Sequence, residues 1–504
     1  MSAEADLFSG PPRVRTLNGR GHDIDGDYVL YWMVGARRTR HNFALERALS
    51  WASEAGRPLI VLEALRVDYR WASARHHAFV IQGMADNRAA FADTPVRYWP
   101  YVEPEPGAGK GLVDALAARA VVVVTDDWPG FFVGPMIESV GARLPVRTEA
   151  VDGNGLLPID HATKGFARAY DLRRFLQREL RPWLVRVPSA EPLADIVLPS
   201  DPELPAEVEE RWPRASRELL AHPCSGVRDL PVDQDVPPVT DTPGGSVHGR
   251  EVLQRFVGER MRHYAEGRRD VTDVTASELS PWLHYGHLGA HEVFAAITES
   301  EGWTPDRLST SKSGAREGWW GMSPGAEGYL DQLVTWRELG FNLYRHNPRP
   351  DDYETLPDWA QATLEEHASD EREWTYELDQ FERAETHDEV WNAAQRQLLR
   401  SGVIHNYLRM YWGKMVLAWS ASPQEALAIV FELNNRWALD GRDPNSSTGI
   451  TWVFGRYDRP WGPEREVFGK VRYMSPENTR KKLRLAAYLE RWDAQGGLFS
   501  GSRE

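Results

Sequence analysis

Three tryptophans occur at spacings that could carry single electrons. Trp391 lies in one stretch of helical apolar spacing and Trp412 and Trp419 lie in the next, with Ser401 and Gly402 between the two stretches. On a helix, Trp412 and Trp419 are two turns apart along one face, separated by roughly 10 Å of rise. Tryptophan usually packs in a core because it buries a large area. The three residues are therefore core aromatics or an electron relay, and a relay requires a redox cofactor.

A polar turn follows these stretches. The segment LDGRDPN at 439–445 places Asp440 and Asp443 between two apolar stretches, and Asn434 lies on the first of them. Such residues make ordinary surface turns, but a polar turn in this context should face a pocket, where its donors and acceptors could bind a polar heterocycle. A buried Asn434 amide needs a partner, and Arg409 in the apolar run YLRMYW needs a carboxylate or a ligand phosphate.

The segment from Trp452 to Arg484 is basic, although the whole chain is acidic. With 74 acidic and 59 basic residues, the chain has a formal charge of -15, which argues mildly against a non-specific nucleic-acid binder. Within the segment, nine basic residues outnumber four acidic ones and interleave with Trp452, Trp461 and Tyr473. Basic and aromatic side chains on one face would suit a phosphate backbone and an exposed base. The alternative is a solvated helix end.

The composition bounds the class of protein. A chain of 504 residues, 42% hydrophobic and 26% charged, is expected to form two or three globular domains. The apolar run VVVVTDDW at 121–128 meets Asp126 too early to span a membrane. The N-terminal residues lack a secretion signal, so we expect a cytoplasmic protein. Cys224 is the single cysteine, which excludes an intrachain disulfide and a thiolate-rich metal site; no metal is expected.

The pattern of apolar residues divides the chain into three parts. Short apolar runs alternate with amphipathic stretches, which predicts an α/β domain with a mostly parallel sheet over residues 25–196. No GxGxxG follows the first expected strand, so a standard nicotinamide site is not expected. Nine of the 34 prolines lie between 197 and 245, and we interpret 197–248 as an interdomain linker. Residues 249–491 have helical spacing, which predicts an all-α domain whose helix ends include Gly402, Ser422 and Gly441.

Several long motifs carry a family resemblance. The stretch THDEVWNAAQRQLLRSGVIHNYLRMYWGKMVLAWS at 386–420, LDGRDPNSSTGITW at 439–452 and EVFGKVRYMS at 466–475 strongly resemble the class II cyclobutane pyrimidine dimer photolyases. The resemblance extends more weakly to YLDQLVTWREL at 329–339, SELSPWLHYGHLG at 277–289, HYAEGRRD at 263–270 and YWMVGARRTRHNFAL at 31–45. The better-matched part is about half of the chain.

The resemblance implies a fold and an activity. It implies a photolyase/cryptochrome-like flavoprotein with an N-terminal Rossmann-like antenna domain and a helical domain that holds FAD. In this family, fully reduced FAD excited by blue light gives an electron to a flipped-out pyrimidine dimer, the cyclobutane ring splits and the electron returns. The dimer must leave the base stack before the flavin can reach it. The implied enzyme is a deoxyribodipyrimidine photo-lyase, the partner is DNA containing pyrimidine dimers, and we expect a monomer.

The resemblance also assigns residues to the flavin. Positions that hold the FAD phosphates and ribityl chain are matched by Tyr264, Arg268, Ser277, Leu279 and Ser280. Positions that line the flavin ring are matched by Arg409, Trp412, Asp440 and Asp443, and the position facing N5 is matched by Asn434. Trp412, Trp391 and Trp419 resemble the family's electron relay, which reduces the flavin after light absorption. This resemblance favours function over core packing for the three.

Further positions match those that grip DNA. Trp336 and Trp452, with Met410 beside them, match the aromatic walls that hold the flipped dimer, consistent with stacking on an extruded base. The segment that fills the gap left in the duplex and grips its backbone is matched by Asp458, Arg459, Trp461 and Arg472. The resemblance therefore implies that the basic segment from Trp452 to Arg484 binds DNA.

Two departures from the class II pattern bear on function. Gln332 stands where these enzymes usually present a glutamate toward the dimer; a glutamine supplies no carboxylate, so dimer splitting is less efficient or the lesion differs. The stretch RRTRHN at 37–42 replaces a more acidic family stretch, which leaves open whether the second, antenna chromophore is a deazaflavin, a folate or absent.

The alternative functions differ in how the energy of the absorbed light is used. A cryptochrome-like blue-light photoreceptor would have the same flavin and relay without repair, and Gln332 favours it. Trp336, Trp452 and Arg472 favour repair, because a receptor need not retain dimer walls or a duplex plug. Repair of the (6-4) lesion is a weaker hypothesis, because that activity belongs to family branches without these motifs. Light-independent FAD oxidoreduction is also weaker, because the sequence shows no nicotinamide site and no obvious acid-base pair.

Overall fold

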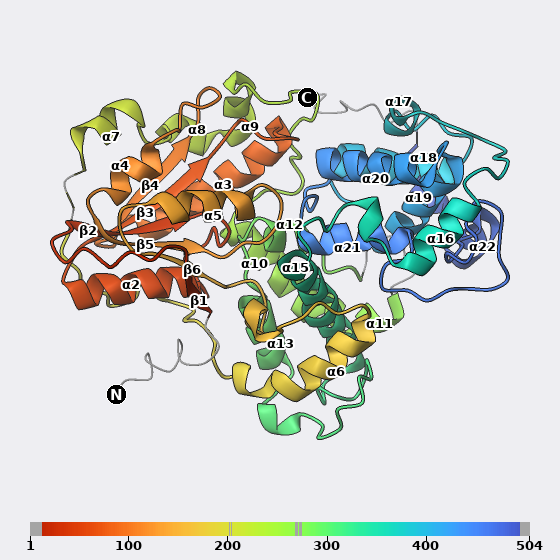
Figure 1. Cartoon of the computed structure of the whole chain (residues 1–504), viewed down its shortest axis with the longest axis horizontal. Coiled ribbons are helices and arrows are strands. Elements are labelled where there is room, and N and C mark those ends of the chain that lie inside the picture. Colours follow the sequence, from red (N-terminus) through yellow and green to blue (C-terminus); the bar gives the residue numbers. More distant parts are fainter. Residues whose placement is uncertain (1–12, 201, 203, 268–270, 272–274, 494–504) are drawn as a thin grey trace. The chain divides into compact units, whose positions relative to one another are not determined.

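A computed structural model describes residues 13–200, 202, 204–267, 271 and 275–493 (Figure 1). The chain forms two compact units. The first comprises Met1–Thr163, Leu176–Gln254 and Leu279–Asp306, and the second comprises Lys164–Phe175, Arg255–Glu278 and Arg307–Glu504. The units interleave along the sequence, and the domain limits at 196 and 248 stay a prediction.

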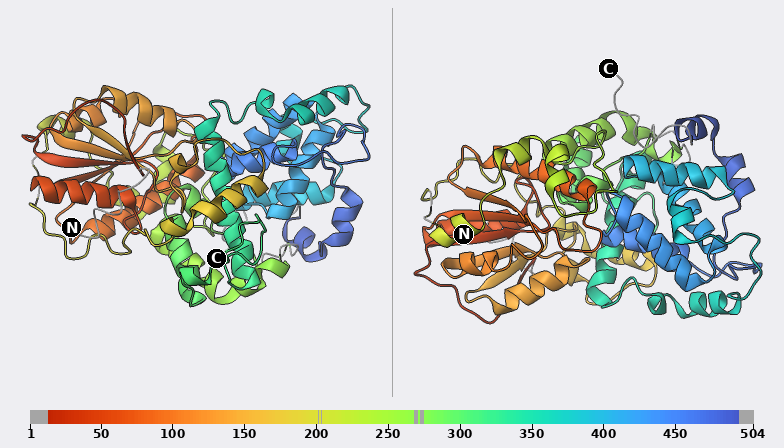
Figure 2. Two further views of the ribbon diagram at one scale, coloured as in Figure 1. Left: turned by 60° about the horizontal axis from the view of Figure 1, so that its bottom comes forward. Right: turned by 90° about the horizontal axis from the view of Figure 1, so that it is seen from above.

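The first unit contains one six-stranded sheet. Its strands are β1 (Val14–Thr16), β2 (Tyr28–Met33), β3 (Leu59–Leu65), β4 (Arg97–Val102), β5 (Ala120–Asp126) and β6 (Thr148–Val151). They lie in the order β1-β6-β5-β2-β3-β4; β1 pairs with β6 antiparallel, and the other neighbours are parallel. Helices cover both faces (Figure 2): α2 (Phe43–Ala55), α3 (Ala74–Phe91), α4 (Leu112–Ala117) and α5 (Val133–Arg143). The predicted α/β architecture with a mostly parallel sheet is confirmed.

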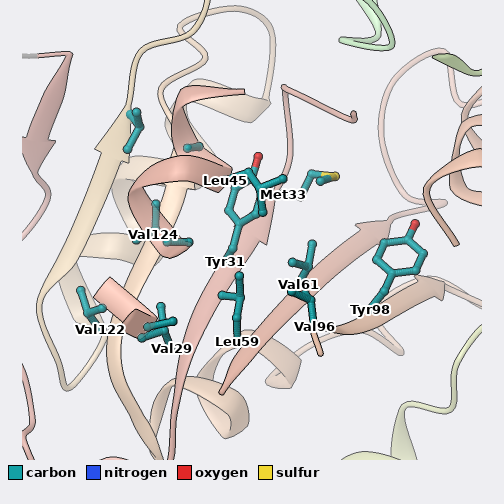
Figure 3. Close-up of a cluster of buried hydrophobic side chains, with 14 of the residues drawn as sticks. Val29, Tyr31, Met33, Leu45, Leu59, Val61, Val96, Tyr98, Val122 and Val124 are labelled. Carbon is teal, nitrogen blue, oxygen red and sulfur yellow. The ribbon is translucent and has the colours of Figure 1, made fainter. Parts of the chain in front are cut away.

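The two faces of β2 show why the sequence forms this sheet. All six residues of β2 are buried, as expected of a parallel strand covered on both sides. Successive side chains point to opposite faces. Val29 and Tyr31 pack in the cluster that includes Leu45 of α2 (Figure 3), whereas the Tyr28 hydroxyl donates to the carbonyl of Leu116 in α4, 2.8 Å away.

The basic stretch at 37–42 has partners inside the first unit. Asn42 caps α2, because its side-chain oxygen accepts from the backbone N–H of Leu45 at 3.0 Å. Arg37 pairs with the buried carboxylate of Glu63 at 3.1 Å. Arg38 donates to the carbonyl of Gly286 at 3.0 Å. The fold therefore accommodates the departure from a more acidic family stretch.

The proline-rich segment forms short helices. They are α7 (Ala206–Arg211), α8 (Arg217–Ala221) and α9 (Pro223–Gly226), as expected where prolines interrupt regular structure. Leu220 and Val227 are buried in a cluster with residues of α3. The segment thus belongs to the first unit and buries apolar side chains against α3.

After β6 the described residues form helices and no further strand, and the helical region predicted for residues 249–491 is confirmed. The larger helices are α6 (Ala169–Glu179), α10 (Ser246–Arg255), α13 (Ala290–Ser300), α15 (Arg337–His346), α16 (Asp358–Glu366), α18 (Glu389–Ser401), α19 (Asn406–Trp419), α20 (Pro423–Trp437) and α21 (Pro444–Val453). The shorter ones are α11 (Tyr264–Gly267), α12 (Ser280–His284), α14 (Pro324–Leu330), α17 (Leu378–Glu382), α22 (Pro476–Lys482) and α23 (Ala486–Arg491). Figure 1 shows α18, α19 and α20 as neighbours, and α19 packs against both others.

Two of the three predicted helix ends are confirmed. Ser422 accepts from the backbone N–H of Glu425 and begins α20, and Gly402 ends α18 with a φ of 70°. Gly441 does not end a helix, because α20 already stops at Trp437, where Ala438 turns to extended backbone with ψ 133°. The helix therefore ends three residues earlier than expected.

Helix α15 approaches the start of α21 at Gly340, where a Cβ would lie 2.6 Å from the carbonyl carbon of Pro444. Replacing a mid-helix glycine by alanine usually gains about 1 kcal/mol, but forcing atoms into a packed contact costs about 1–3 kcal/mol. We expect Gly340→Ala to lower the free energy of unfolding by roughly 1–2 kcal/mol in urea titrations, since the neighbour is backbone.

The matched control is Gly449→Ala on α21, where a Cβ would meet nothing within 4 Å. This variant should be as stable as the parent or more so. A Gly340→Ala protein with unchanged or raised stability would show that α15 and α21 are not held at this contact.

Candidate functional site

Trp391, Trp412 and Trp419 come together in the second unit. The rings of Trp391 and Trp412 are stacked, with centroids 6.2 Å apart and planes 8° apart. Trp391 and Trp419 have centroids 6.3 Å apart. Trp391, on α18, thus lies between the two tryptophans of α19, which are two turns apart. The sequence placed the three on adjacent helices, and the structure gives them the order Trp412, Trp391, Trp419.

Hydrogen bonds fix the first two rings. The Trp391 indole N–H donates to the carbonyl of Trp412 at 2.9 Å, and the Trp412 indole N–H donates to Oε1 of Gln395 at 2.9 Å. Asp388 anchors the start of α18, because it accepts from the Trp391 backbone N–H and from the Tyr411 hydroxyl, each at 2.9 Å. Burial and this carboxylate raise the pKa of Tyr411, which keeps the phenol protonated as the donor.

The series of rings continues toward solvent. Trp419, only 7% exposed, contacts His387 with centroids 4.7 Å apart. His387 in turn stacks on Trp374 at 4.6 Å and 17°. Trp374 is 42% exposed, so the ring series joins a buried indole to an accessible one. Sequence reasoning missed His387, because its stacking depends on the fold.

The polar turn places Arg409 against Asp440. The guanidinium donates to both carboxylate oxygens, at 2.8 and 3.2 Å, in the bidentate arrangement that suits arginine. The sequence required an anionic partner for Arg409, and the structure supplies this carboxylate. The Nε of Arg409 is buried and has no hydrogen-bond partner among the residues that the structure describes. The turn is tied to the end of α18, since Leu439 donates its backbone N–H to the carbonyl of Gly402 at 2.8 Å.

Asn434 and Asp443 lie at the two sides of this turn. Asn434 is buried, and its amide nitrogen donates to Oδ1 of Asn435 at 3.0 Å and to Oγ of Ser446 at 2.9 Å. Both amide hydrogens are therefore used within the protein. Asp443 caps α21 by accepting from the backbone N–H of Asn445 at 2.8 Å. Arg442 between them has a φ of 67°, a left-handed conformation typical of strained functional turns.

Gln332 and Trp336 share a π-helical turn, Asp331–Trp336, between α14 and α15. Such turns are rare and are frequent at functional sites. Both side chains are half-buried. Trp452 lies near the end of α21 and is also half-buried. Met410 is half-buried on α19.

The basic segment after α21 arranges cations on indoles. Arg472 lies 5.8 Å from the ring centroid of Trp452 and 4.9 Å from that of Trp461. Arg459 lies 4.4 Å from the Trp461 ring. Asp458 holds Trp461 by accepting from its indole N–H at 3.1 Å. Three residues of the expected duplex plug thus contact the fourth, Trp461, and Arg459 and Arg472 are exposed.

The residues expected at the FAD phosphates are divided. In the second unit, the rings of Tyr264 and Tyr329 are 5.4 Å apart, and Ser277 hydrogen-bonds with Tyr329. Leu279 and Ser280 begin α12 in the first unit; Leu279 is buried and Ser280 is exposed. Arg268 lies outside the described residues.

Lys414 is a further residue that sequence reasoning missed. It is completely buried on α19, its Nζ donates to the carbonyl of Val453, and it lies 5.2 Å from the ring centroid of Trp452. Burial lowers its pKa to about 7. The available signal was a lysine inside the apolar run MYWGKMVLAW. Among the residues that the structure describes, no group of three or more His, Cys, Asp or Glu side chains could hold a metal ion.

Comparisons with known proteins agree with this architecture. The chain is 31% identical over 485 residues to the deoxyribodipyrimidine photo-lyase of Methanothermobacter thermautotrophicus, spanning 95% of this chain and 97% of the relative. It is 31% identical over 492 residues to that of Oryza sativa subsp. japonica, spanning 95% and 89%, and 30% identical over 484 residues to that of Potorous tridactylus, spanning 94% and 83%. No model of a protein family matches the chain.

A solved structure shares the fold. The crystal structure of a bacterial class III photolyase from Agrobacterium tumefaciens superimposes with a TM-score of 0.66 over 93% of this chain and 86% of that one, at 17% identity. The three relatives, each at least 30% identical over most of its length, show that the chain belongs to the photolyase/cryptochrome family. No helix within the described ranges is long and apolar enough to cross a bilayer.

Proposed function

We propose that the chain is a class II cyclobutane pyrimidine dimer photolyase, which repairs DNA by light-driven electron transfer from reduced FAD to a flipped-out dimer. The observation that carries this proposal is the cation–indole series after α21, in which Arg472 lies near the rings of both Trp452 and Trp461. The ordered ring series Trp412, Trp391, Trp419 in the second unit supports the light-driven electron transfer, which repair shares with a receptor. The relatives named deoxyribodipyrimidine photo-lyase support repair as the activity.

The polar turn fits a flavin. The buried Nε of Arg409, which no described residue pairs with, is a donor that a ligand oxygen or nitrogen would satisfy. Because both amide hydrogens of Asn434 are donated within the protein, its carbonyl oxygen is the atom left to accept from a protonated ring nitrogen. The flavin ring would be held by Arg409, Trp412, Asn434, Asp440 and Asp443. The phosphates and ribityl chain would be held by Tyr264, Arg268, Ser277, Leu279 and Ser280. FAD would supply the photochemical electron, and a deazaflavin-type antenna chromophore is proposed for the first unit.

The Arg409–Asp440 pair is expected to be needed for flavin retention. Asp440→Asn removes the countercharge from a guanidinium whose side chain is 16% exposed, and loss of one partner of a buried pair is costly. We expect at least about tenfold weaker flavin binding, or about 1.4 kcal/mol, measured as flavin retained per protein after dialysis. The control Asp379→Asn breaks an exposed pair with Arg383, which should change nothing. Full flavin content in Asp440→Asn would contradict this role.

Damaged DNA would be gripped by the segment after α21. Trp336 and Trp452, with Met410, would form the walls for the dimer, because indoles offer large faces for stacking on extruded bases. The gap in the duplex would be filled by the segment that holds Asp458, Arg459, Trp461 and Arg472, and its two arginines would neutralise backbone phosphates. Gln332 would donate a hydrogen bond to a base carbonyl where relatives of class II place a carboxylate. The protein would bind DNA as a monomer.

The test illuminates the chemically reduced holoprotein with an oligonucleotide carrying one thymine dimer, and separately with one carrying a (6-4) lesion. We expect light-dependent recovery of thymine absorbance for the dimer alone. Recovery from the (6-4) lesion alone would overturn the lesion assignment. If neither is repaired while flavin is bound and photoreducible, the protein is a cryptochrome-like receptor.

A further inference from the structure

Lys414 is a buried cation that neither the ring series nor the flavin site uses. Its side chain is completely buried, and its ammonium group donates to the carbonyl of Val453, the last residue of α21. Gly413 lets the helices approach here, because a Cβ would lie 2.8 Å from Cγ2 of Val453. The lysine is thereby held against the end of α21, where Trp452 lies.

Lys414 is also the buried end of an alternating series of cations and indoles. Its Nζ is 5.2 Å from the ring centroid of Trp452, Arg472 lies near the rings of both Trp452 and Trp461, and Arg459 lies over Trp461. Cation–π attraction is strongest where the cation is desolvated. Lys414 is the member of this series that is fully removed from water, so it should hold its indole most firmly.

The charges around Lys414 set its protonation. Burial lowers its pKa, the Asp458 carboxylate raises it and Arg472 lowers it, and the net result is a pKa of about 7. Asp458 and Arg472 both lie in the segment after α21, and they are the charged groups that act on this pKa. A lysine with a lowered pKa in the folded state costs stability, and an apolar side chain of similar volume would cost less. Its presence therefore calls for a role other than packing.

We propose that Lys414 is a positioning residue for lesion binding: its ammonium group fixes the Trp452 indole and the end of α21 in the orientation that stacks on an extruded pyrimidine pair. This inference rests on the proposed function. Lys414 does not contact the lesion; it acts through Trp452, and through Arg472 it is linked to Trp461. Loss of its charge should weaken recognition of the lesion and leave general DNA binding unchanged.

The first test compares dark binding of the holoprotein to a labelled duplex with one thymine dimer and to the same duplex undamaged. For Lys414→Met we expect at least about tenfold weaker binding of the damaged duplex, about 1.4 kcal/mol, with the undamaged duplex unaffected. Flavin content and photoreduction should stay at the parent level. The control Lys470→Met removes the same charge from an exposed lysine of the basic segment, and it should affect both duplexes equally. A Lys414→Met protein with the parent's preference for the damaged duplex overturns the proposal.

The second test needs no variant. Because the ammonium form is lost as pH rises through about 7, the parent's preference for the damaged duplex should fall between about pH 6 and about pH 8. Lys414→Met should lack this dependence. A flat preference in the parent across this range overturns the inference, even if the variant fails to fold. A parent without preference for damaged DNA at any pH contradicts the proposed function itself.

Discussion

Trp391→Phe should abolish light-driven reduction of the bound flavin while leaving the flavin in place. Trp391 is the middle ring, 6.2 Å from Trp412 and 6.3 Å from Trp419. Phenylalanine keeps most of the packing, but its ring is harder to oxidise than indole by far more than about 3 kcal/mol, the difference that corresponds to a 100-fold change in rate. We therefore expect photoreduction in the presence of a thiol reductant to slow by at least about 100-fold.

The matched control is Trp282→Phe in the first unit. Trp282 is equally buried and loses the same volume, so any effect of destabilisation appears in both variants. Photoreduction in Trp282→Phe should match the parent. If Trp391→Phe is reduced at the parent's rate, electrons reach the flavin by a route that does not pass through this stacked pair.

Trp452→Ala is expected to have the second largest effect, on binding of damaged DNA in the dark. Stacking of a base on an aromatic side chain contributes about 1–3 kcal/mol by alanine substitution, which corresponds to roughly 5- to 150-fold in affinity. The half-buried indole is also held by Lys414 and Arg472, so the binding face is preorganised and its loss should fall in the upper part of this range.

Trp71→Ala in the first unit provides the comparison, since Trp71 is also half-buried but lies far along the chain from the basic segment. Its affinity for a duplex with one thymine dimer should equal the parent's. Equal affinity of Trp452→Ala and the parent would remove Trp452 from the walls of the lesion site.

Local patterns predicted the features that depend on neighbours in sequence. The alternation of apolar runs with amphipathic stretches indicated the parallel sheet, because fully buried strands such as β2 read as continuous apolar runs. The seven-residue spacing of Trp412 and Trp419 placed them on one helix face. The need of Arg409 for a counterion anticipated its pairing with Asp440.

Features that depend on packing between helices could not be read from the sequence. Lysine is usually exposed to solvent, but Lys414 is buried where α19 approaches α21 at Gly413. His387 joins the ring series because the segment before α18 folds back on Trp419. The π-helical turn that carries Gln332 and Trp336 has the same apolar spacing as an ordinary helix.

The most direct measurement is single-flash repair by Trp391→Phe whose flavin has first been reduced chemically. The proposal separates two tasks: the tryptophan series delivers electrons to the flavin, and the lesion walls bring the dimer to it. With the first task bypassed, the variant should restore as many thymines per flash as the parent, with none restored in the dark. A reduced variant that binds the dimer but restores no thymines would contradict this division and the proposed mechanism of repair.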